Sequence, residues 1–424
     1  MEEVDVAGIG AGPSNLALIT ALLDVRERGE TVPSTVFLER AGDFAWHPGS
    51  RLPGARIQVP FLKDLATQRN PRSRFTFLNY LYEAGRIEAF ANLRELFPTR
   101  DEFADYLAWV ATQSGPLIRY RCGATALVPL LRDGRCSRIG VVLDGAAEPA
   151  IAARAVVVGT GRAPFLPPIK GIDDPRVTHS STLVPWWRAR AGQTPPQRVL
   201  VVGGGQSAIE SACYVLAANA TASVSLCLRQ PAPAAIDDNP FVNDWYTSER
   251  SSAFAALPAS RRAHLLAGLA GSNFGVADRS LLEQLHRYGY EGRCHGVDRV
   301  VLLAERELTG IEPAEHMLHC RLRDVADGST AMQAADAVIL ATGYAREEPP
   351  LLQGLHAWLC RDVDGRLRPD ADYRLAAAPG FDAAVFMHGT REDCHGPAEG
   401  SLATRAVRAG VLFGALRRLL VAAP

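Results

Sequence analysis

The sequence predicts an α/β fold with two similar units, each made of a buried strand, a glycine-rich turn and a helix. The first unit begins with an apolar run at 4–9, which leads through closely spaced glycines into a helical pattern. The second repeats this order in mid-chain, after an apolar run at 199–202. Two more runs, at 155–161 and 336–344, end in small residues and suit the points where the chain changes domain. We therefore expect two Rossmann-like dinucleotide-binding domains, the second inserted into the first.

The first glycine turn has the features of an anion-binding site. Gly8, Gly10 and Gly12 allow a ligand to approach the backbone, and the following helix offers unpaired N–H groups to a pyrophosphate. The turn departs from the usual fingerprint because Pro13 stands where a third glycine is expected. Glu39 ends the next apolar run, where its carboxylate could accept hydrogen bonds from a ribose. The alternative is a strand–turn–helix with a purely structural role.

The second glycine turn fits the pattern G-x-G-x-x-A in full, through Gly203, Gly205 and Ala208. The strand after it ends at Arg229, whereas a carboxylate at this place would bind a free ribose 2′-hydroxyl. An arginine favours a 2′-phosphate, so we expect this unit to bind NADPH in preference to NADH. The alternative is that Arg229 is an ordinary surface residue.

Three irregular segments, at 44–71, 232–245 and 271–275, contain prolines, glycines and polar residues that fit neither a helix nor a strand. Structured loops on a nucleotide-binding fold often carry function. The residues that stand out in these segments are Trp46, His47, Gln58, Lys63, Asn243 and Asn273. Each also has an ordinary explanation, as a core tryptophan, a satisfied polar group, a solvated lysine or a turn-forming asparagine.

Composition and charge exclude several classes of function. A net charge of −1 over 424 residues gives no electrostatic surface for nucleic acid or an anionic membrane. No apolar run approaches the roughly 20 residues that span a bilayer, and we expect no signal peptide, because no basic region or cleavage site stands before the first strand. The eight cysteines are scattered without a metal-binding spacing, so we expect reduced thiols, no metal site and a cytoplasmic protein.

Two nucleotide sites, one of them for NADPH, indicate electron transfer from NADPH to a flavin. Flavin disulfide reductases need a closely spaced cysteine pair, which this sequence lacks. Baeyer–Villiger monooxygenases carry an FxGxxxHxxxW-type segment between their glycine turns. The histidine found here is His179, with Pro175 and Leu183 in place of the glycine and the tryptophan. The remaining use of a reduced flavin is reaction with oxygen to oxidise a nucleophilic substrate.

Several segments carry a family resemblance that extends over nearly the whole chain. They include GIGAGPSNLAL, FAWHPG, SNFGVAD and HGPAEGSLATRAVR, and the most specific are QVPFLKDL and DDNPFVN. Through them the sequence resembles the flavin-dependent N-hydroxylating monooxygenases, the L-ornithine and L-lysine N-monooxygenases of siderophore biosynthesis. The resemblance implies FAD and NADPH as cofactors, a small-molecule amine and O2 as substrates, and a homo-oligomer, either a tetramer or a dimer.

The resemblance also implies roles for individual residues. It places FAD against Gly8, Gly10, Gly12, Pro13, Ser14, Asn15, Glu39, Trp46, His47, Gln58, Ser401 and Leu402. It places NADPH against Gly203, Gly205, Gln206, Ser207 and Arg229. Lys63 would pair with the carboxylate of the substrate, and Asn243 and Asn273 would hold its amino-acid end. Gln58 would act in catalysis, near the flavin and the bound nicotinamide.

On this basis we expect an FAD-binding domain at 1–165 and 336–424, with an inserted NADPH-binding domain at 166–335. A small substrate-binding region would lie at about 232–290. The implied reaction is hydroxylation of the side-chain amine of L-ornithine to N5-hydroxyornithine through a C4a-hydroperoxyflavin, for siderophore or related natural-product biosynthesis.

The C-terminal tail, at 385–420, leaves the identity of the amine substrate undecided. The ornithine enzymes read roughly HGLSDTLLS here, whereas this sequence reads HGPAEGSLA, so Ala398 and Ala403 replace two serines. L-Lysine, putrescine and cadaverine therefore remain alternatives, although Asn273 favours ornithine. Two broader alternatives are another NADPH-dependent flavin oxidoreductase and a nucleotide-binding regulatory protein without enzymatic activity.

Overall fold

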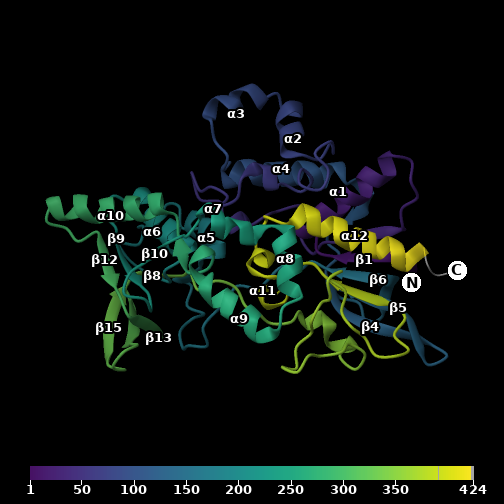
Figure 1. The fold of residues 1–424 in the computed structure, drawn as a ribbon. Helices are drawn as coiled ribbons and strands as arrows, with labels where there is room; N and C mark the ends of the chain where they lie inside the picture. The colour runs from purple at the N-terminus through teal and green to yellow at the C-terminus, as the bar shows by residue number, and fades with distance from the viewer. Residues whose placement is uncertain (390, 422–424) are drawn as a thin grey trace.

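The computed structural model describes residues 1–389 and 391–421 and contains two mainly parallel β-sheets, one in each half of the molecule (Figure 1). The first sheet, on the right of Figure 1, is formed by segments from both ends of the chain. The second sheet, on the left, is formed by strands between residues 177 and 340. This arrangement confirms the predicted α/β fold with two Rossmann-like units, one inserted into the other.

The first sheet has the strand order β3-β2-β1-β6-β5-β4, and β17 pairs with the end of β6. Its strands are β1 (Glu2–Ile9), β2 (Thr35–Leu38), β3 (Ile118–Arg119), β4 (Ala124–Arg132), β5 (Arg135–Leu143), β6 (Pro149–Val158) and β17 (Ala384–Met387). β4 and β5 form an antiparallel hairpin, and the turn between them consists of Asp133 and Gly134, with φ values of 52° and 76°. An Asp-Gly pair favours this kind of turn, because both of its positions need a positive φ.

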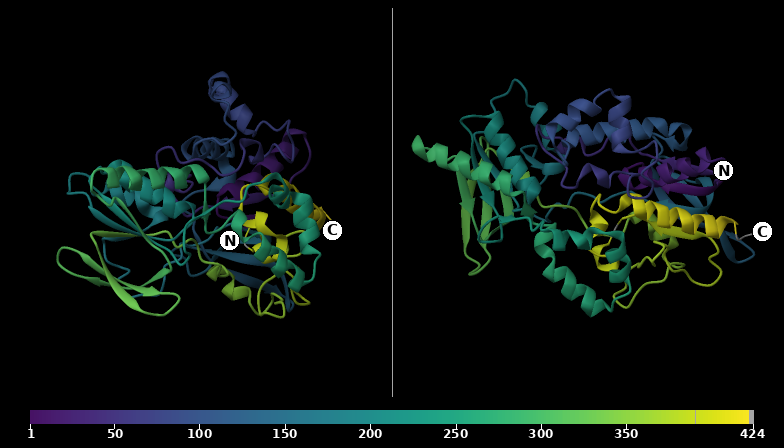
Figure 2. Two further views of the ribbon diagram at one scale, coloured as in Figure 1. Left: turned by 60° about the vertical axis from the view of Figure 1, so that its left-hand side comes forward. Right: turned by 45° about the horizontal axis from the view of Figure 1, so that its top comes forward.

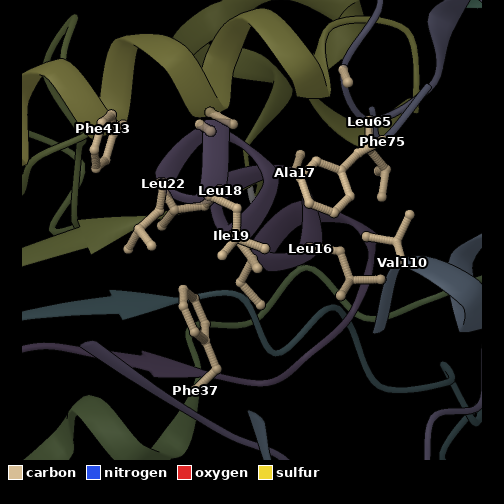
Figure 3. Packing of buried hydrophobic residues seen from close by; sticks show 14 of the residues in the cluster. Leu16, Ala17, Leu18, Ile19, Leu22, Phe37, Leu65, Phe75, Val110 and Phe413 are labelled. Atoms are coloured by element: carbon tan, nitrogen blue, oxygen red, sulfur yellow. The ribbon is translucent and has the colours of Figure 1, made fainter. Parts of the chain in front are cut away.

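Three helices cover one face of the first sheet: α1 (Pro13–Glu27), α4 (Arg100–Gln113) and α12 (Arg405–Val421). α1 is buried along almost its whole length because β-strands, α4 and α12 all pack around it. In Figure 3, Leu18 and Leu22 of α1 lie between Phe37 of β2 and Phe413 of α12. This packing holds the start of α1, and with it the first glycine turn, at the carboxyl end of the parallel strands.

The second sheet is parallel throughout, in the order β12-β9-β8-β16-β7. Its strands are β7 (Val177–His179), β8 (Arg198–Val202), β9 (Ser223–Cys227), β12 (Val300–Leu303) and β16 (Ala337–Leu340). Helices α5 (Leu183–Arg188), α6 (Gln206–Ala218) and α10 (Arg279–Cys294) contribute to the core on one face. The antiparallel strands β13 (Arg306–Pro313), β14 (Leu318–Asp324) and β15 (Thr330–Ala335) cover the other face.

Strand β16 shows where the inserted unit ends. The expected boundary between residues 335 and 336 lies before this strand, yet β16 pairs with both β8 and β7. The second sheet therefore extends to Leu340, because the apolar run at 336–344 supplies its strand β16.

Short helices connect the second unit to the tail of the first. α7 (Pro240–Asn243), α8 (Ser248–Ala255) and α9 (Ala259–Gly268) follow β10 (Ala234–Ala235), which pairs with β11 (Val276–Ala277). Both views of Figure 2 show α8 and α9 beside the yellow tail, where they contact α11 (Glu392–His395). The predicted helix break at 271–275 lies between α9 and α10.

The remaining helices, α2 (Phe77–Glu83) and α3 (Ile87–Leu93), form the projection at the top of Figure 1. The start of α4 below them is capped by Thr99, whose hydroxyl accepts a hydrogen bond from the N–H of Glu102 (3.1 Å). Within 1–389 and 391–421, no helix has the length and apolar character that crossing a bilayer requires.

Candidate active site

The first glycine turn joins β1 to α1, and its three glycines have different surroundings. Gly10 has a φ of 86°, and a Cβ atom on it would lie 2.8 Å from the carbonyl oxygen of Gly159, so a larger residue would be strained. At Gly8, a Cβ atom would meet the ring of Phe37. At Gly12, by contrast, it would meet no atom within 4 Å. The first two glycines therefore shape the turn, and the third faces space that a ligand can enter.

Polar groups around this turn are held by the backbone. Glu39, just after β2, accepts hydrogen bonds from the N–H groups of Ala11 (2.8 Å) and Ala41 (2.9 Å). Asn15 is fully buried, and its side-chain amide donates to two carbonyl oxygens at the end of β1 (3.1 and 2.7 Å). Glu39 is thus fixed beside the turn, while the side-chain N–H groups of Asn15 stabilise the backbone of the turn itself.

The starts of α1 and α12 lie against each other. Pro13 and Ser14, in the first turn of α1, are buried. Ser401 and Leu402, shortly before α12, are half-buried, and Leu402 packs against the core around α1. Residues predicted to bind FAD therefore gather at one place although they come from both ends of the chain. Their contacts with FAD stay predictions.

Trp46 and His47 lie in the irregular segment after β2. The Trp46 ring packs edge-on against His47 (centroid distance 5.2 Å), and the His47 ring faces Tyr344 (6.2 Å). His47 has a φ of 44°, a left-handed conformation that is uncommon for a residue other than glycine. Surrounding protein and the positive charges of Arg100 and Arg405 lower the pKa of His47 to about 4, although solvent reaches the ring. His47 is therefore neutral at physiological pH.

Lys63 is half-buried and has no anionic partner among the described residues. It ends a short turn at Phe61–Lys63, and its side chain makes no ion pair or hydrogen bond within the described residues. Burial lowers the pKa of Lys63. It is also one of only two lysines among the 45 lysines and arginines of the sequence. A partly desolvated, unpaired ammonium group fits a carboxylate that a ligand supplies.

Gln58 lies five residues before Lys63. It is exposed, and its amide has no hydrogen-bond partner in the part of the chain that the structure describes. The residue between them that anchors the segment is Val59, which packs against the buried residues Tyr246, Ala398 and Ala403. The segment with the candidate catalytic and carboxylate-binding residues is therefore joined both to the tail and to the helices after α7.

Tyr246, which packs against Val59, also positions the segments that contain the two candidate asparagines. It follows Asn243 by three residues, and its hydroxyl bonds to the carbonyl oxygen (3.2 Å) and the hydroxyl (2.9 Å) of Ser272. The next residue is Asn273, whose side chain makes no hydrogen bond to residues 1–389 or 391–421. Asn243 is exposed, and its amide donates to the carbonyl oxygen of Asp238 (2.7 Å). The fold thus assembles segments that lie far apart in the sequence.

The second glycine turn joins β8 to α6. Gly203 has a φ of 139°, and a Cβ atom on it would lie 2.5 Å from a carbonyl oxygen just after β16. Gly205 lies against Gly275, whose Cα atom would be 3.3 Å from an added Cβ. Ser207 and Arg229 are exposed, and the Arg229 guanidinium has no partner among the described residues. It is therefore free to bind a phosphate.

Gln206 has a different environment from its neighbours in this turn. Its amide nitrogen donates to the carboxylates of Glu210 (2.9 Å) and Asp278 (3.1 Å), and its oxygen accepts from the N–H of Asp278 (2.9 Å). Glu210 in turn forms a bidentate ion pair with Arg100 of α4 (2.9 and 3.1 Å). Gln206 therefore links the second glycine turn to the start of α10 and, through Glu210, to the first unit.

The tail carries charged residues to which the sequence analysis assigned no role, although they lie within the segment HGPAEGSLATRAVR. Arg408 of α12 is buried and pairs with Glu399 (3.1 Å). Arg405, one turn earlier, donates hydrogen bonds to the hydroxyl of Ser14 and to the carbonyl oxygen of Ser401. The signal that could have found them is the presence of two arginines three residues apart at the start of an otherwise apolar helix.

Comparison with known proteins assigns the family. The family model described as L-lysine 6-monooxygenase/L-ornithine 5-monooxygenase matches residues 2–346. The chain belongs to this family. Its members are flavin amine N-monooxygenases, so the resemblance seen in QVPFLKDL and DDNPFVN is confirmed, and with it the predicted class of enzyme.

Individual relatives of this monooxygenase cover nearly the whole chain. It is 37% identical to an L-ornithine N(5)-monooxygenase of Burkholderia cepacia, over 95% of this chain and 92% of that protein. The ornithine N-hydroxylase of Kutzneria sp. 744, in its FADred–NADP+–L-orn form, is 30% identical with a TM-score of 0.92, over 98% of this chain and 99% of that one. An L-lysine 6-monooxygenase from Pseudomonas syringae is 32% identical with a TM-score of 0.88, over 98% and 100% of the two chains.

Proposed function

We propose that this monooxygenase hydroxylates the side-chain amine of L-ornithine to N5-hydroxyornithine, with FAD and NADPH as cofactors and O2 as the oxidant. The observation that carries the proposal is Lys63, a half-buried and unpaired ammonium group near the segments that contain Asn243 and Asn273. An amino acid presents a carboxylate to this group, whereas a diamine does not. The ornithine enzymes of Burkholderia cepacia and Kutzneria support this substrate. The product would serve siderophore or related natural-product biosynthesis.

Each of the two glycine turns would bind one cofactor. FAD fits the first turn, because Gly12 faces open space at the start of a 15-residue helix, where partial positive charge accumulates. NADPH fits the second turn, because the exposed Arg229 is available for a 2′-phosphate. When bound, FAD would accept a hydride from NADPH and react with O2, which supplies the oxygen atom for the amine.

We assign the domains accordingly. The FAD-binding domain comprises 1–165 and the part of 336–424 that follows β16, and the NADPH-binding domain comprises 166–335 together with β16 itself. The segment at about 232–290 binds the substrate. The pairing of β16 in the second sheet and the contacts of α8 and α9 with α11 support this division.

The chain's own residues bind and orient the substrate. Lys63 would anchor the carboxylate, and Asn243 and Asn273 would hold the amino-acid end, which leaves the side-chain amine directed to the flavin. Gln58, exposed and unpaired, is available to donate a hydrogen bond at the cofactors. The amine must be neutral to react, because an ammonium group has no lone pair, and such amines have an ordinary pKa of about 10.4. We therefore expect activity to rise toward slightly alkaline pH.

L-Lysine is the second candidate substrate. Ala398 and Ala403 are buried and pack against Tyr246, at positions where the ornithine pattern has serines. Alanine removes two hydroxyl groups and leaves a more apolar wall, which suits a side chain that is one methylene longer. The lysine 6-monooxygenase of Pseudomonas syringae, at 32% identity, supports this candidate.

A substrate panel separates the candidates. Purified enzyme with FAD and NADPH is incubated with L-ornithine, L-lysine, putrescine or cadaverine, and hydroxylamine formation and NADPH oxidation are measured together. We expect the highest kcat/KM with L-ornithine. A preference for L-lysine would select the second candidate, and hydroxylation of diamines alone would contradict the role of Lys63. NADPH oxidation without any hydroxylamine would indicate a different flavin oxidoreductase.

We also propose that the enzyme is a homo-oligomer that works in the cytoplasm. The region around α2 and α3 exposes large apolar side chains, namely Leu78, Tyr82, Leu93, Leu96 and Phe97. Clustered apolar surface of this kind marks contact sites between proteins. Light scattering should give a mass that is a multiple of 45.7 kDa, and a monomer would contradict this assignment. All eight cysteines are free, which fits a reducing compartment.

A further inference from the structure

A group of charged and polar side chains lies where the start of α12 meets the start of α1. Arg405 is the first residue of α12, and its Nη1 donates a hydrogen bond to the hydroxyl of Ser14 in the first turn of α1. Its Nε donates to the carbonyl oxygen of Ser401 (3.2 Å). Its Nη2 makes no hydrogen bond to any residue in 1–389 or 391–421. One edge of the guanidinium is therefore free beside the first glycine turn.

The charges in this group, which consists of Arg405, Arg408, Glu399 and His388, do not cancel. Arg408 and Glu399 form a buried ion pair (3.1 Å), with 1% and 3% of their side chains exposed. His388 is buried, and its burial together with the charges of Arg408 and Arg405 holds its pKa well below the usual range, so the imidazole is neutral. Arg405 has no ion pair with a carboxylate among the described residues. The group therefore carries one positive charge in excess.

Hydrogen-bond donors in the group are also in excess. Nε and Nη1 of Arg408 are buried, and neither has a partner in the part of the chain that the structure describes. Surrounding protein and the charge of Arg408 lower the pKa of Arg405 to about 9. Buried donors and poorly solvated charges are unfavourable unless a partner satisfies them. The missing partner is an anion with several acceptor oxygens.

The glycine turn itself offers fewer donors to such an anion than its pattern implies. Pro13 has no N–H group, and the N–H of Ala11 is bonded to the carboxylate of Glu39 (2.8 Å). Few backbone donors at the turn therefore remain for a pyrophosphate, although the N-terminus of α1 still contributes partial positive charge.

We propose that Arg405 binds the pyrophosphate of FAD and supplies the charge and the hydrogen bonds that the first glycine turn lacks. This inference rests on the assignment of FAD to that turn in the proposed function. Arg405 lies 391 residues after Ser14 in the sequence, so no glycine motif reveals it. Bound FAD would then connect the start of α12 to the start of α1.

The variant Arg405→Gln tests the proposal through FAD affinity. Apo-protein is titrated with FAD, and the dissociation constant is obtained from flavin fluorescence. Loss of a charge-assisted contact should weaken binding about tenfold or more, and Arg405→Lys, which keeps the charge, should recover part of this loss. Arg418→Gln is the matched control, because Arg418 lies on the same helix in an exposed ion pair with Asp372. It should bind FAD as the wild type does.

Thermal unfolding distinguishes ligand binding from a structural role. If Arg405 serves FAD, Arg405→Gln leaves the Tm of the apo-protein unchanged or higher and reduces the increase that FAD produces. A lower apo Tm with an unchanged increase would overturn the proposal, as would equal FAD affinity in variant and wild type. If the glutamine variant does not fold, Arg405→Lys is compared with the wild type in the same two measurements, and we expect a severalfold weaker affinity for FAD. Failure of the wild type to bind FAD would contradict the proposed function itself.

Discussion

The two glycine turns have similar sequences and different surroundings. The first lies at the start of a buried helix, close to the tail, where Arg408 and Glu399 are almost completely buried. The second begins α6, where Ser207 and Arg229 are exposed to solvent. The same local motif is therefore enclosed by protein in one unit and open in the other.

This difference indicates two modes of cofactor binding. Charges that protein surrounds act through a low dielectric and are weakly screened, so they hold a ligand strongly. An exposed arginine acts through water, and salt weakens its attraction for a phosphate. The expected consequence is an FAD that stays bound through many reaction cycles and an NADPH that exchanges.

The largest effect is expected for Gly10→Ala, which tests whether the enclosed turn depends on close backbone packing. The positive φ at residue 10 strains an alanine, and its Cβ atom would lie too close to the carbonyl oxygen of Gly159. The substitution should therefore lower the free energy of unfolding by about 3 kcal/mol and prevent FAD binding. Gly29→Ala is the control, because Gly29 has a similar φ of 77° in open surroundings. It should cost about 1 kcal/mol. Equal losses in chemical denaturation would show that the packing does not matter.

Lys63→Ala should have the next largest effect, on the affinity for the substrate. Without the ammonium group, KM for L-ornithine should rise about 100-fold, while the enzyme still oxidises NADPH. The exposed Lys170 is the only other lysine, and Lys170→Ala should leave KM unchanged. Steady-state kinetics with both readouts test this prediction. Normal ornithine binding by Lys63→Ala would contradict a contact with the carboxylate.

Arg229→Ala tests the open turn and should have a smaller effect. KM for NADPH should rise about tenfold at low salt and less at high salt, while KM for NADH stays constant, since NADH has no 2′-phosphate. Arg287→Ala, which removes another exposed arginine of the same unit, is the control. An equal change for both nucleotides would show that Arg229 does not recognise the 2′-phosphate.

The smallest effect is expected for the pH dependence of the free energy of unfolding, to which His47 contributes. The folded-state pKa of His47 is about 4, against 6.5 for the free side chain. The unfolded chain therefore takes up a proton first, and the free energy of unfolding should fall as the pH decreases from 6.5 toward 4. In urea denaturation at several pH values, His47→Asn should reduce this slope. An unchanged slope would show that His47 titrates normally in the folded protein.

Local features of the fold could be predicted because they depend on neighbouring residues. Examples are both glycine turns, the hairpin at Asp133 and Gly134 and the cap at Thr99. The environments of Gln206 and Arg405 could not, because their partners lie far away in the sequence. The sheet to which the run at 336–344 belongs could not be predicted for the same reason, since only the pairing of β16 with β8 decides it.

The chain of hydrogen bonds from Arg100 through Glu210 and Gln206 to Asp278 constrains how the enzyme can open. A rotation of the second unit away from the first would have to separate Arg100 from the buried Glu210. Gln206 and Asp278 connect the second glycine turn to the start of α10. The starts of α4, α6 and α10 are therefore fixed relative to one another by one continuous set of side-chain hydrogen bonds.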